Sequence, residues 1–255
     1  MQSAQQVVLI TGGAKGVGRG ISESFLAAGA QVVITARNAP EEAIAVDGNS
    51  AEFIAADIRD VEACQQLIAS IIEQHGRIDV LVNNAGGSPF ALADQASPRF
   101  HEAIIRLNLL APLNLAQAAN TRMQQQTSGG VIINIGSVSA DRPSPGTAAY
   151  GAAKAGLLNL TQSLAVEWAP KVRVVAVSPG PVLTEQAHLH FGNEAGIAAV
   201  AGTIPMQRLA QPQDIGQACL WLASDQAGYV SGSNLLLHGG GEKPAFLDKA
   251  TANQG

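Results

Sequence analysis

The stretch Thr11-Gly12-Gly13-Ala14-Lys15-Gly16-Val17-Gly18 decides the fold of this chain. It begins at the end of the strand-like run Val7–Thr11 and leads into the helical pattern Gly16–Ala28. Glycine allows a tight turn and the close approach of a phosphate to backbone amides, because it has no Cβ. A glycine-rich string alone is a weak signal and can be a turn that binds nothing. Its place between a strand and a helix predicts a nucleotide-binding βαβ unit.

Strand-like and helix-like segments alternate outward from this turn. The predicted strands are short, β-branched and apolar on both faces, as parallel strands beneath helices are. They are Val7–Thr11, Gln31–Ala36, Glu52–Ala56, Val80–Val82, Val131–Ile135, Val172–Val177 and Asn234–Leu237. The predicted helices are Gly16–Ala28, Val61–Gln74, Pro98–Gln125, Ala149–Ala169 and Pro212–Ala223. This alternation predicts an α/β fold, a doubly wound parallel sheet with helices on both faces and ligands at the carboxyl ends of its strands.

The composition is that of a globular protein. The chain has 255 residues, of which 47% are apolar and 14% charged, and its net charge is −5. These values exclude a disordered tail and argue against nucleic acid or an anionic membrane as a partner. The N-terminus has no cationic segment before its apolar stretch, so we expect a cytoplasmic protein. Cys64 and Cys219 lack a CxxC spacing and are predicted to be reduced core thiols, and no metal site is expected.

We expect one domain over residues 1–255. Residues 185–206 are rich in Ala and Gly, have no clear pattern and are a candidate substrate lid. The tail, residues 242–255, either reaches a neighbouring subunit or frays.

The end of the second predicted strand bears on the choice of nicotinamide cofactor. NAD-binding units carry an acidic residue there, whereas NADP-binding units offer Arg. Here Ala36 stands in the acidic position and Arg37 follows it, while Lys15 of the glycine turn is placed to reach the same 2′-phosphate. The sequence therefore predicts NADP(H) over NAD(H). The alternative is that Lys15 and Arg37 are ordinary solvated cations.

Two further strand ends face the predicted cofactor. Asp57 can accept a hydrogen bond from the adenine amino group, or can cap the next turn. The segment Asn83–Gly86 has the small and amide side chains that suit a loop against the cofactor, and Asn83 can equally tie neighbouring strands together.

Tyr150 and Lys154 lie one helical turn apart in Tyr-Gly-Ala-Ala-Lys, downstream of Ser137. Free tyrosine has a pKa of about 10, and a cation within ~4–6 Å lowers it. We therefore predict that Lys154 lowers the pKa of Tyr150, which then exchanges a proton with a carbonyl oxygen. Ser137 would supply a second hydrogen bond to that oxygen.

Taken in order, these motifs resemble the short-chain dehydrogenase/reductase family over nearly the whole chain. The resemblance implies a catalytic set of Asn108, Ser137, Tyr150 and Lys154, with Asn108 holding a water that links Lys154 to solvent. Ser137 lies 13 residues before Tyr150, the family's common spacing, and the alternative Ser139 fits less well. The resemblance also implies a homotetramer, built through the long fourth and fifth helices and the last strand.

The resemblance places a turn beneath the nicotinamide at residues 179–182, to which Thr184 would add a hydroxyl, with a plain rigid turn as the alternative. The full predicted NADP(H) set is Gly12, Lys15, Gly16, Val17, Gly18, Arg37, Asp57, Ile58, Asn84, Ala85, Gly86, Tyr150, Lys154, Pro179, Gly180, Val182 and Thr184. The predicted substrate set is Ser88, Arg142 and Phe191, with a surface ion pair as the alternative for Arg142.

The predicted function is hydride transfer between NADP(H) and a small-molecule ketone or secondary alcohol. Alternatives with the same site are a 3-oxoacyl thioester reductase and a hydroxysteroid dehydrogenase. A third alternative, from another class, is a non-catalytic regulator that senses NADP(H), which would be expected to have a damaged catalytic set.

Overall fold

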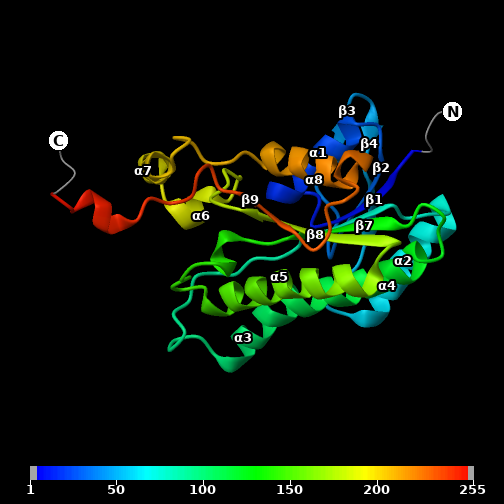
Figure 1. Ribbon diagram of the computed structural model, residues 1–255, viewed down its shortest axis with the longest axis horizontal. Helices are drawn as coiled ribbons and strands as arrows, with labels where there is room; N and C mark the ends of the chain where they lie inside the picture. The colour runs from blue at the N-terminus through cyan, green and yellow to red at the C-terminus, as the bar shows by residue number, and fades with distance from the viewer. Residues whose placement is uncertain (1–4, 252–255) are drawn as a thin grey trace.

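A computed structural model describes residues 5–251 and contains one seven-stranded parallel sheet (Figure 1). The strand order is β5-β2-β1-β6-β7-β8-β9. The strands are β1 Val7–Thr11, β2 Gln31–Ala36, β5 Glu52–Ala55, β6 Val80–Asn83, β7 Gly130–Ile135, β8 Val172–Pro179 and β9 Asn234–Leu237. The chain starts in the middle of the sheet, builds outward to β5 and then crosses back to β6. The predicted doubly wound fold is therefore confirmed, and its strand order reverses between β1 and β6, where ligands bind in such sheets.

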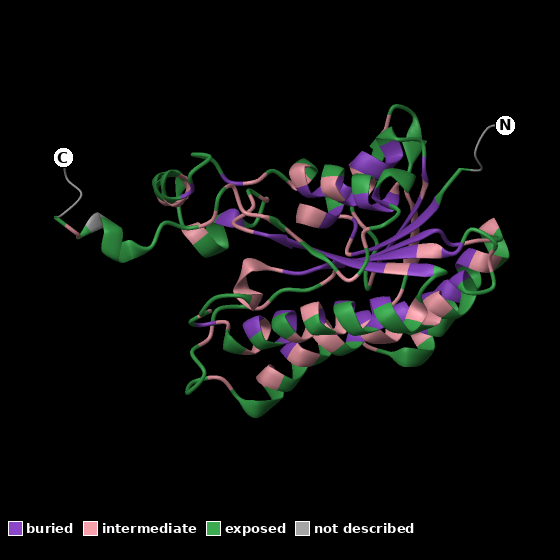
Figure 2. Ribbon diagram, viewed as in Figure 1, coloured by how far each residue is buried: buried purple, intermediate pink, exposed green. Residues whose placement is uncertain are grey.

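Helices cover both faces of the sheet (Figure 1). One face carries α1 Gly16–Ala27 and α8 Pro212–Ala223, and the other carries α2 Val61–His75, α4 Ala111–Met123 and α5 Ala148–Trp168. The five inner strands, β2, β1, β6, β7 and β8, are almost wholly buried between them, whereas the edge strands β5 and β9 are partly exposed (Figure 2). On the first face Phe25 and Ile215 pack on the sheet, and on the second Leu67 and Leu115 do so. Apolar burial on both faces explains why these strands read as continuous hydrophobic runs.

Glycine allows α1 and α8 to lie close together. A Cβ on Gly20 would overlap the backbone and ring of Pro212, and one on Gly216 would overlap Ser24. A glycine of each helix faces a side chain of the other at this contact, so α1, which follows the glycine turn, packs closely against α8.

The predicted helix Pro98–Gln125 is interrupted. It consists of α3 Pro98–Ile105, a π-helical turn η1 Arg106–Leu110, and α4 Ala111–Met123. Single π-helical turns inside helices occur mostly at functional sites. The helical pattern of apolar residues continues across the π-helical turn, so the sequence did not reveal the interruption.

Several short elements lie outside the predicted ones. β3 Ala45–Val46 and β4 Asn49–Ser50 form a hairpin around Asp47-Gly48, both with positive φ, and this Asp-Gly pair was a readable signal for it. The candidate lid contains α6 Ala187–Phe191 and α7 Glu194–Thr203. Short 3-10 turns are η2 Val138–Ala140, η3 Asp225–Ala227 and η4 Ala245–Asp248, the last in the tail.

Cys64 and Cys219 are free thiols buried on opposite faces of the sheet, as predicted for core cysteines. Over residues 5–251, no helix is both long enough and apolar enough to span a membrane.

Candidate functional site

The glycine turn joins β1 to α1 at the carboxyl edge of the sheet. Gly12 and Gly16 have φ of 64° and 52°, a region that glycine enters without strain. A Cβ on Gly18 would overlap the carbonyl of Gly12, so the turn closes only with glycine there. The backbone amide of Gly12 donates to Thr35 O at 2.8 Å, which anchors the turn to β2.

The loop after β6 is tied to this turn. The hydroxyl of Thr11 accepts hydrogen bonds from the amides of Asn84 and Ala85, each at 2.9 Å. The side-chain amide of Asn84 donates to Thr11 O at 2.9 Å and to Gly12 O at 3.3 Å. The predicted cofactor residues Gly12, Asn84 and Ala85 therefore lie together in a rigid cradle at the sheet edge.

Asn83 does tie neighbouring strands together, as its alternative role proposed. Its side-chain amide donates to Asn134 Oδ1 of β7 at 2.9 Å. Asn134 in turn donates to the hydroxyl of Thr161 on α5 at 2.9 Å. This buried chain of hydrogen bonds connects the loop side of β6 to the helix that carries Tyr150 and Lys154.

A cavity of about 200 Å³ opens between the ends of β1, β2 and β5. Its lining includes the predicted cofactor residues Gly12, Arg37, Asp57, Ile58, Ala85 and Gly86. Ala36 lines it as well, so no acidic side chain stands at the end of β2. Lys15 precedes α1 as its N-cap residue and is exposed.

Arg59 also lines this cavity, and the sequence reading missed it. Its guanidinium donates to both carboxylate oxygens of Asp57, at 2.9 Å from Nε and 2.6 Å from Nη2. This pairing, helped by the charge of Arg37, lowers the pKa of Asp57 to about 2. The amide of Arg59 also donates to Asp57 Oδ1 at 3.1 Å, which is the turn capping considered as an alternative. The Asp-x-Arg spacing was the signal that could have identified Arg59.

The structure brings Ser137, Tyr150 and Lys154 together. Lys154 is 3% exposed, donates to Ile135 O at 2.7 Å, and has its Nζ 5.6 Å from the centre of the Tyr150 ring. Ser137, two residues after the end of β7, lies near Tyr150 and acts on its phenol as a hydrogen-bonding neighbour that lowers its pKa. The hydroxyl of Ser137 also accepts from the amide of Ser139 at 3.1 Å, so Ser139 here supports Ser137 through its backbone.

The predicted lowering of the Tyr150 pKa is wrong in this structure. Burial raises the pKa of Tyr150, and the hydrogen bond with Ser137 opposes that rise only in part. Burial also lowers the pKa of Lys154 to about 8. Desolvation disfavours the charged forms of both groups, and it is the largest cause of each shift.

Asn108 lies in the π-helical turn and is fully buried. Its Oδ1 accepts from the amide of Gly87 at 2.9 Å, and its Nδ2 donates to Gly87 O at 3.0 Å and to Ile104 O at 2.9 Å. A Cβ on Gly86 would overlap Asn108 Oδ1 and would lie 3.4 Å from Lys154 Nζ. Gly86 therefore lies between Asn108 and Lys154, and there is no room for a side chain at this position.

The segment after β8, residues 180–184, runs from the end of that strand to the glycine turn. The amide of Gly180 donates to Leu237 O at 2.8 Å, and Val182 pairs with Ala210 in an isolated parallel bridge. The segment then runs to Thr184, whose side chain lies beside Gly16. The chain thus runs from Pro179, the last residue of β8, through Gly180, Val182 and Thr184 to the glycine turn, whose Val17 lies in the first turn of α1.

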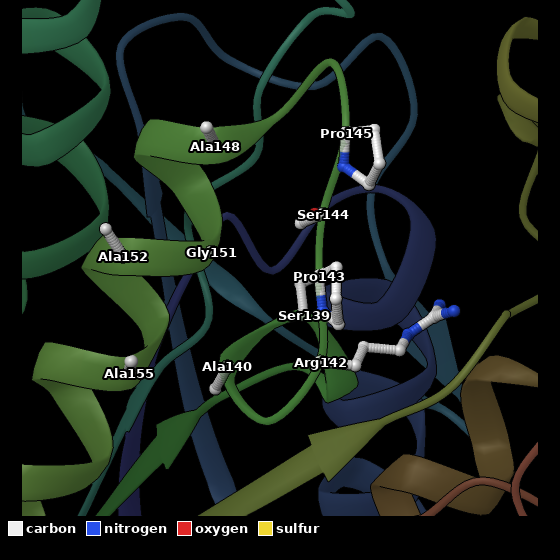
Figure 3. Close-up of a pocket in the computed structure, with 10 residues that line it drawn as sticks. All are labelled: Ser139, Ala140, Arg142, Pro143, Ser144, Pro145, Ala148, Gly151, Ala152 and Ala155. Carbon is white, nitrogen blue, oxygen red and sulfur yellow. The ribbon is translucent and has the colours of Figure 1, made fainter.

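The predicted substrate residues do not share one pocket wall. Arg142 forms an ion pair with Glu242 of the tail, the alternative considered for it. It also lines a cavity of about 420 Å³ beside Ala152 and Ala155 of α5, and its side chain points away from that helix (Figure 3). Ser88 donates to Pro89 O at 2.9 Å, and Phe191 is half-buried at the end of α6. A substrate role for these residues stays a prediction.

Over residues 5–251, no three His, Cys, Asp or Glu side chains are grouped so that they could hold a metal ion.

Known proteins match nearly the whole chain. A family model described as enoyl-(acyl carrier protein) reductase matches residues 12–242. A probable 2,4-dienoyl-CoA reductase of Bacillus subtilis (strain 168) is 33% identical over 92% of this chain and 96% of its own. An L-rhamnose 1-dehydrogenase (NAD(P)(+)) of Azotobacter vinelandii is 34% identical over the same shares, 92% and 96%.

The fold comparison agrees. The ligand-free structure of Thermoplasma acidophilum aldohexose dehydrogenase superposes with a TM-score of 0.86 at 31% identity, over 92% of this chain and 93% of that one. The sequence relatives and the solved structure match this chain over nearly its whole length, while their names differ in substrate. The chain belongs to the short-chain dehydrogenase/reductase family of oxidoreductases.

Proposed function

We propose that this protein is an NADP(H)-dependent reductase of small-molecule ketones that also oxidises the corresponding secondary alcohols. The observation that carries the proposal is the placement of Tyr150 beside the buried Lys154, with Ser137 as a neighbour of the phenol, at the sheet edge that holds the glycine turn. An acid and a second hydroxyl side by side are what a carbonyl oxygen needs as it gains negative charge.

The residues at the edge fit a dinucleotide. The glycine turn closes only because Gly18 has no Cβ, and the cavity at β2 is lined by Arg37 with no carboxylate at Ala36. When bound, the nicotinamide cofactor supplies or accepts the hydride. Gly16, Val17 and Gly18 would hold its diphosphate, Asp57 and Ile58 its adenine, and the segment from Pro179 to Thr184 its nicotinamide.

The chain's own groups then handle the proton. In the reductive direction Tyr150 donates its phenolic proton to the carbonyl oxygen, while Ser137 donates a hydrogen bond to the same oxygen. The raised pKa of Tyr150 keeps this proton in place at neutral pH. Lys154, one turn further along α5, would bind ribose hydroxyls, and Asn108 would hold a water on the path from Lys154 to solvent.

Replacing Tyr150 with Phe tests the catalytic assignment. We expect Tyr150→Phe to abolish turnover of ketones while NADPH still binds, because only the phenolic oxygen is lost. The measurements are NADPH oxidation against a ketone panel and NADPH affinity by calorimetry. Substantial residual turnover in the variant would refute Tyr150 as the acid.

The cofactor preference depends on Arg37 and Lys15. A charge-assisted contact with the 2′-phosphate contributes ~1.5–3 kcal/mol, and about 1.4 kcal/mol is tenfold in affinity. We expect NADPH to bind at least about tenfold more tightly than NADH and Arg37→Ala to reduce that ratio. Equal affinity of the wild-type protein for both would remove the proposal of NADP(H).

Two narrower substrate classes keep the same site. A 3-oxoacyl thioester shares only its acyl thioester group with the enoyl and dienoyl compounds in the names of the matching family model and of the Bacillus subtilis relative, because those names describe reduction of a C=C bond. A hydroxysteroid role is favoured by a 3beta-hydroxysteroid dehydrogenase 1 of Eggerthella lenta, 34% identical over 92% of this chain. A panel of cyclic, steroidal and 3-oxoacyl ketones separates them. The catalytic set carries every family residue type, which disfavours a non-catalytic regulator.

We further propose a single domain, cytoplasmic and homotetrameric, with residues 185–206 as the lid over the substrate and the tail at a subunit contact. Its ligands would be small carbonyl compounds and alcohols, and the net charge of −5 makes nucleic acid and anionic membranes unsuitable partners.

A further inference from the structure

Glu185 contacts the glycine turn although it lies 169 residues after Gly16 in the sequence. Its carboxylate accepts hydrogen bonds from the backbone amide of Gly16, at 3.0 Å to Oε1 and 3.2 Å to Oε2. Gly16 is the first residue of α1, and the preceding N-cap residue, Lys15, makes no side-chain hydrogen bond to this helix end. The carboxylate therefore acts as the anionic cap of α1, where the helix dipole favours negative charge.

The start of the candidate lid lies beside the backbone amide of Gly16. Thr184 packs beside Gly16, and the backbone before it is held by Leu183 N donating to Ala210 O at 2.8 Å. Glu185 is the first residue of the candidate lid, residues 185–206. Its carboxylate is consequently a clasp between the lid and the glycine turn.

A bound diphosphate would compete with this clasp. The amides at the start of α1 are the groups that hold a dinucleotide diphosphate in folds of this kind. Gly16 has a single N–H, and it cannot donate fully to both a carboxylate and a phosphate oxygen. The Glu185 carboxylate and a diphosphate bound at this amide would also repel each other. Because Glu185 is exposed, its side chain can move away from the amide.

We propose that Glu185 competes with the cofactor's diphosphate for the amide of Gly16. This competition sets the affinity for the cofactor. It also means that cofactor binding releases Glu185, the first residue of the lid, from the glycine turn. This inference rests on the proposed nucleotide function and adds a residue that weakens binding rather than supporting it. It holds for NADPH and NADH alike, because both carry the diphosphate.

Calorimetry on the full chain tests the competition. The variants are Glu185→Gln and Glu185→Ala, with Glu42→Gln as the matched control. Glu42 is exposed and, like Glu185, acts electrostatically on Arg19, but among the hydrogen bonds of the described residues it has none to the glycine turn. We expect both Glu185 variants to bind NADPH and NADH about threefold to tenfold more tightly, and the control to change by less than about twofold.

A ligand without a diphosphate separates competition from general charge effects. Adenosine 2′-phosphate should bind the wild type and the Glu185 variants equally. Unchanged or weaker dinucleotide binding in both Glu185 variants overturns the inference, as does an equal gain in Glu42→Gln or with adenosine 2′-phosphate. A wild-type protein that binds neither NADPH nor NADH overturns the proposed function itself, which is a distinguishable result.

Hydrogen exchange gives a readout that does not depend on any nucleotide. In protein without added cofactor, the Gly16 amide should exchange faster in Glu185→Ala than in the wild type, because its acceptor is lost. Exchange in Glu42→Gln should match the wild type. Equal Gly16 exchange in Glu185→Ala and wild type would show that the clasp does not exist in solution.

Discussion

Lys154 and Tyr150 lie on one turn of α5, and burial moves their pKa values in opposite directions. The phenol is held in its neutral form with a raised pKa, and the ammonium loses its proton more readily, with a pKa of about 8. At neutral pH the site therefore contains a proton donor beside a lysine that is still mostly charged. Desolvation is the largest cause of both pKa shifts.

The lowered pKa of Lys154 predicts how stability depends on pH. The unfolded chain keeps this proton up to the ordinary lysine value of 10.5, whereas the folded chain releases it near 8. Between those values the unfolded state binds more protons, so the free energy of unfolding gains a contribution that grows as pH rises. We expect this gain in the wild type and its absence in Lys154→Met, measured by urea unfolding at several pH values between 7 and 10. Parallel pH profiles for the two proteins would contradict the assignment.

At the scale of elements, the close contact of α1 with α8 depends on glycine at the crossing. A Cβ at Gly20 meets the rigid ring and backbone of Pro212, which cannot move aside as a flexible side chain would. The glycine turn begins α1, so any shift of this helix is transmitted to the candidate cofactor site.

Gly20→Ala is expected to destabilise the protein by about 1–3 kcal/mol, as overpacking of a tight contact does. Gly202→Ala in α7 is the matched control, because a Cβ there meets nothing within 4 Å. That control should be neutral or more stable by up to about 1 kcal/mol, since alanine favours helix. Thermal unfolding of both variants checks this, and equal effects would show that the α1–α8 crossing can adjust.

At the scale of the whole molecule, the outer face of α5 is exposed along its length. Small residues line much of it, including Ala148, Ala152 and Ala155, and Val166 near its end is 82% exposed. A helix face of this kind allows a second backbone to approach closely, which agrees with the proposed homotetramer.

Ala155→Arg should reduce the size of the assembly without unfolding the chain, because a long cation replaces a small side chain on the proposed contact face. Ala27→Arg, at the exposed end of α1, is the control and should leave the assembly intact. Light scattering coupled to size exclusion measures both. A tetramer that survives Ala155→Arg would place the subunit contact elsewhere, and a monomeric wild type would end the proposal.

The sequence by itself determined the α/β class, the parallel strands, most helix bounds within a residue or two, and the residue types of the candidate site. These follow from local signals: apolar runs of strand length, glycine where a Cβ cannot fit, and a Tyr–Lys spacing of one helical turn. All of them can be read within about twenty residues of chain.

Only the tertiary structure decided the rest. The π-helical turn at Asn108, the Arg59–Asp57 pair in the cavity and the clasp from Glu185 to Gly16 depend on which segments the fold brings together. The raised pKa of Tyr150 was misjudged from sequence for the same reason: a Lys four residues away is visible in the chain, but the burial of both groups is not. Desolvation is a property of everything packed around a group, and no local spacing encodes it.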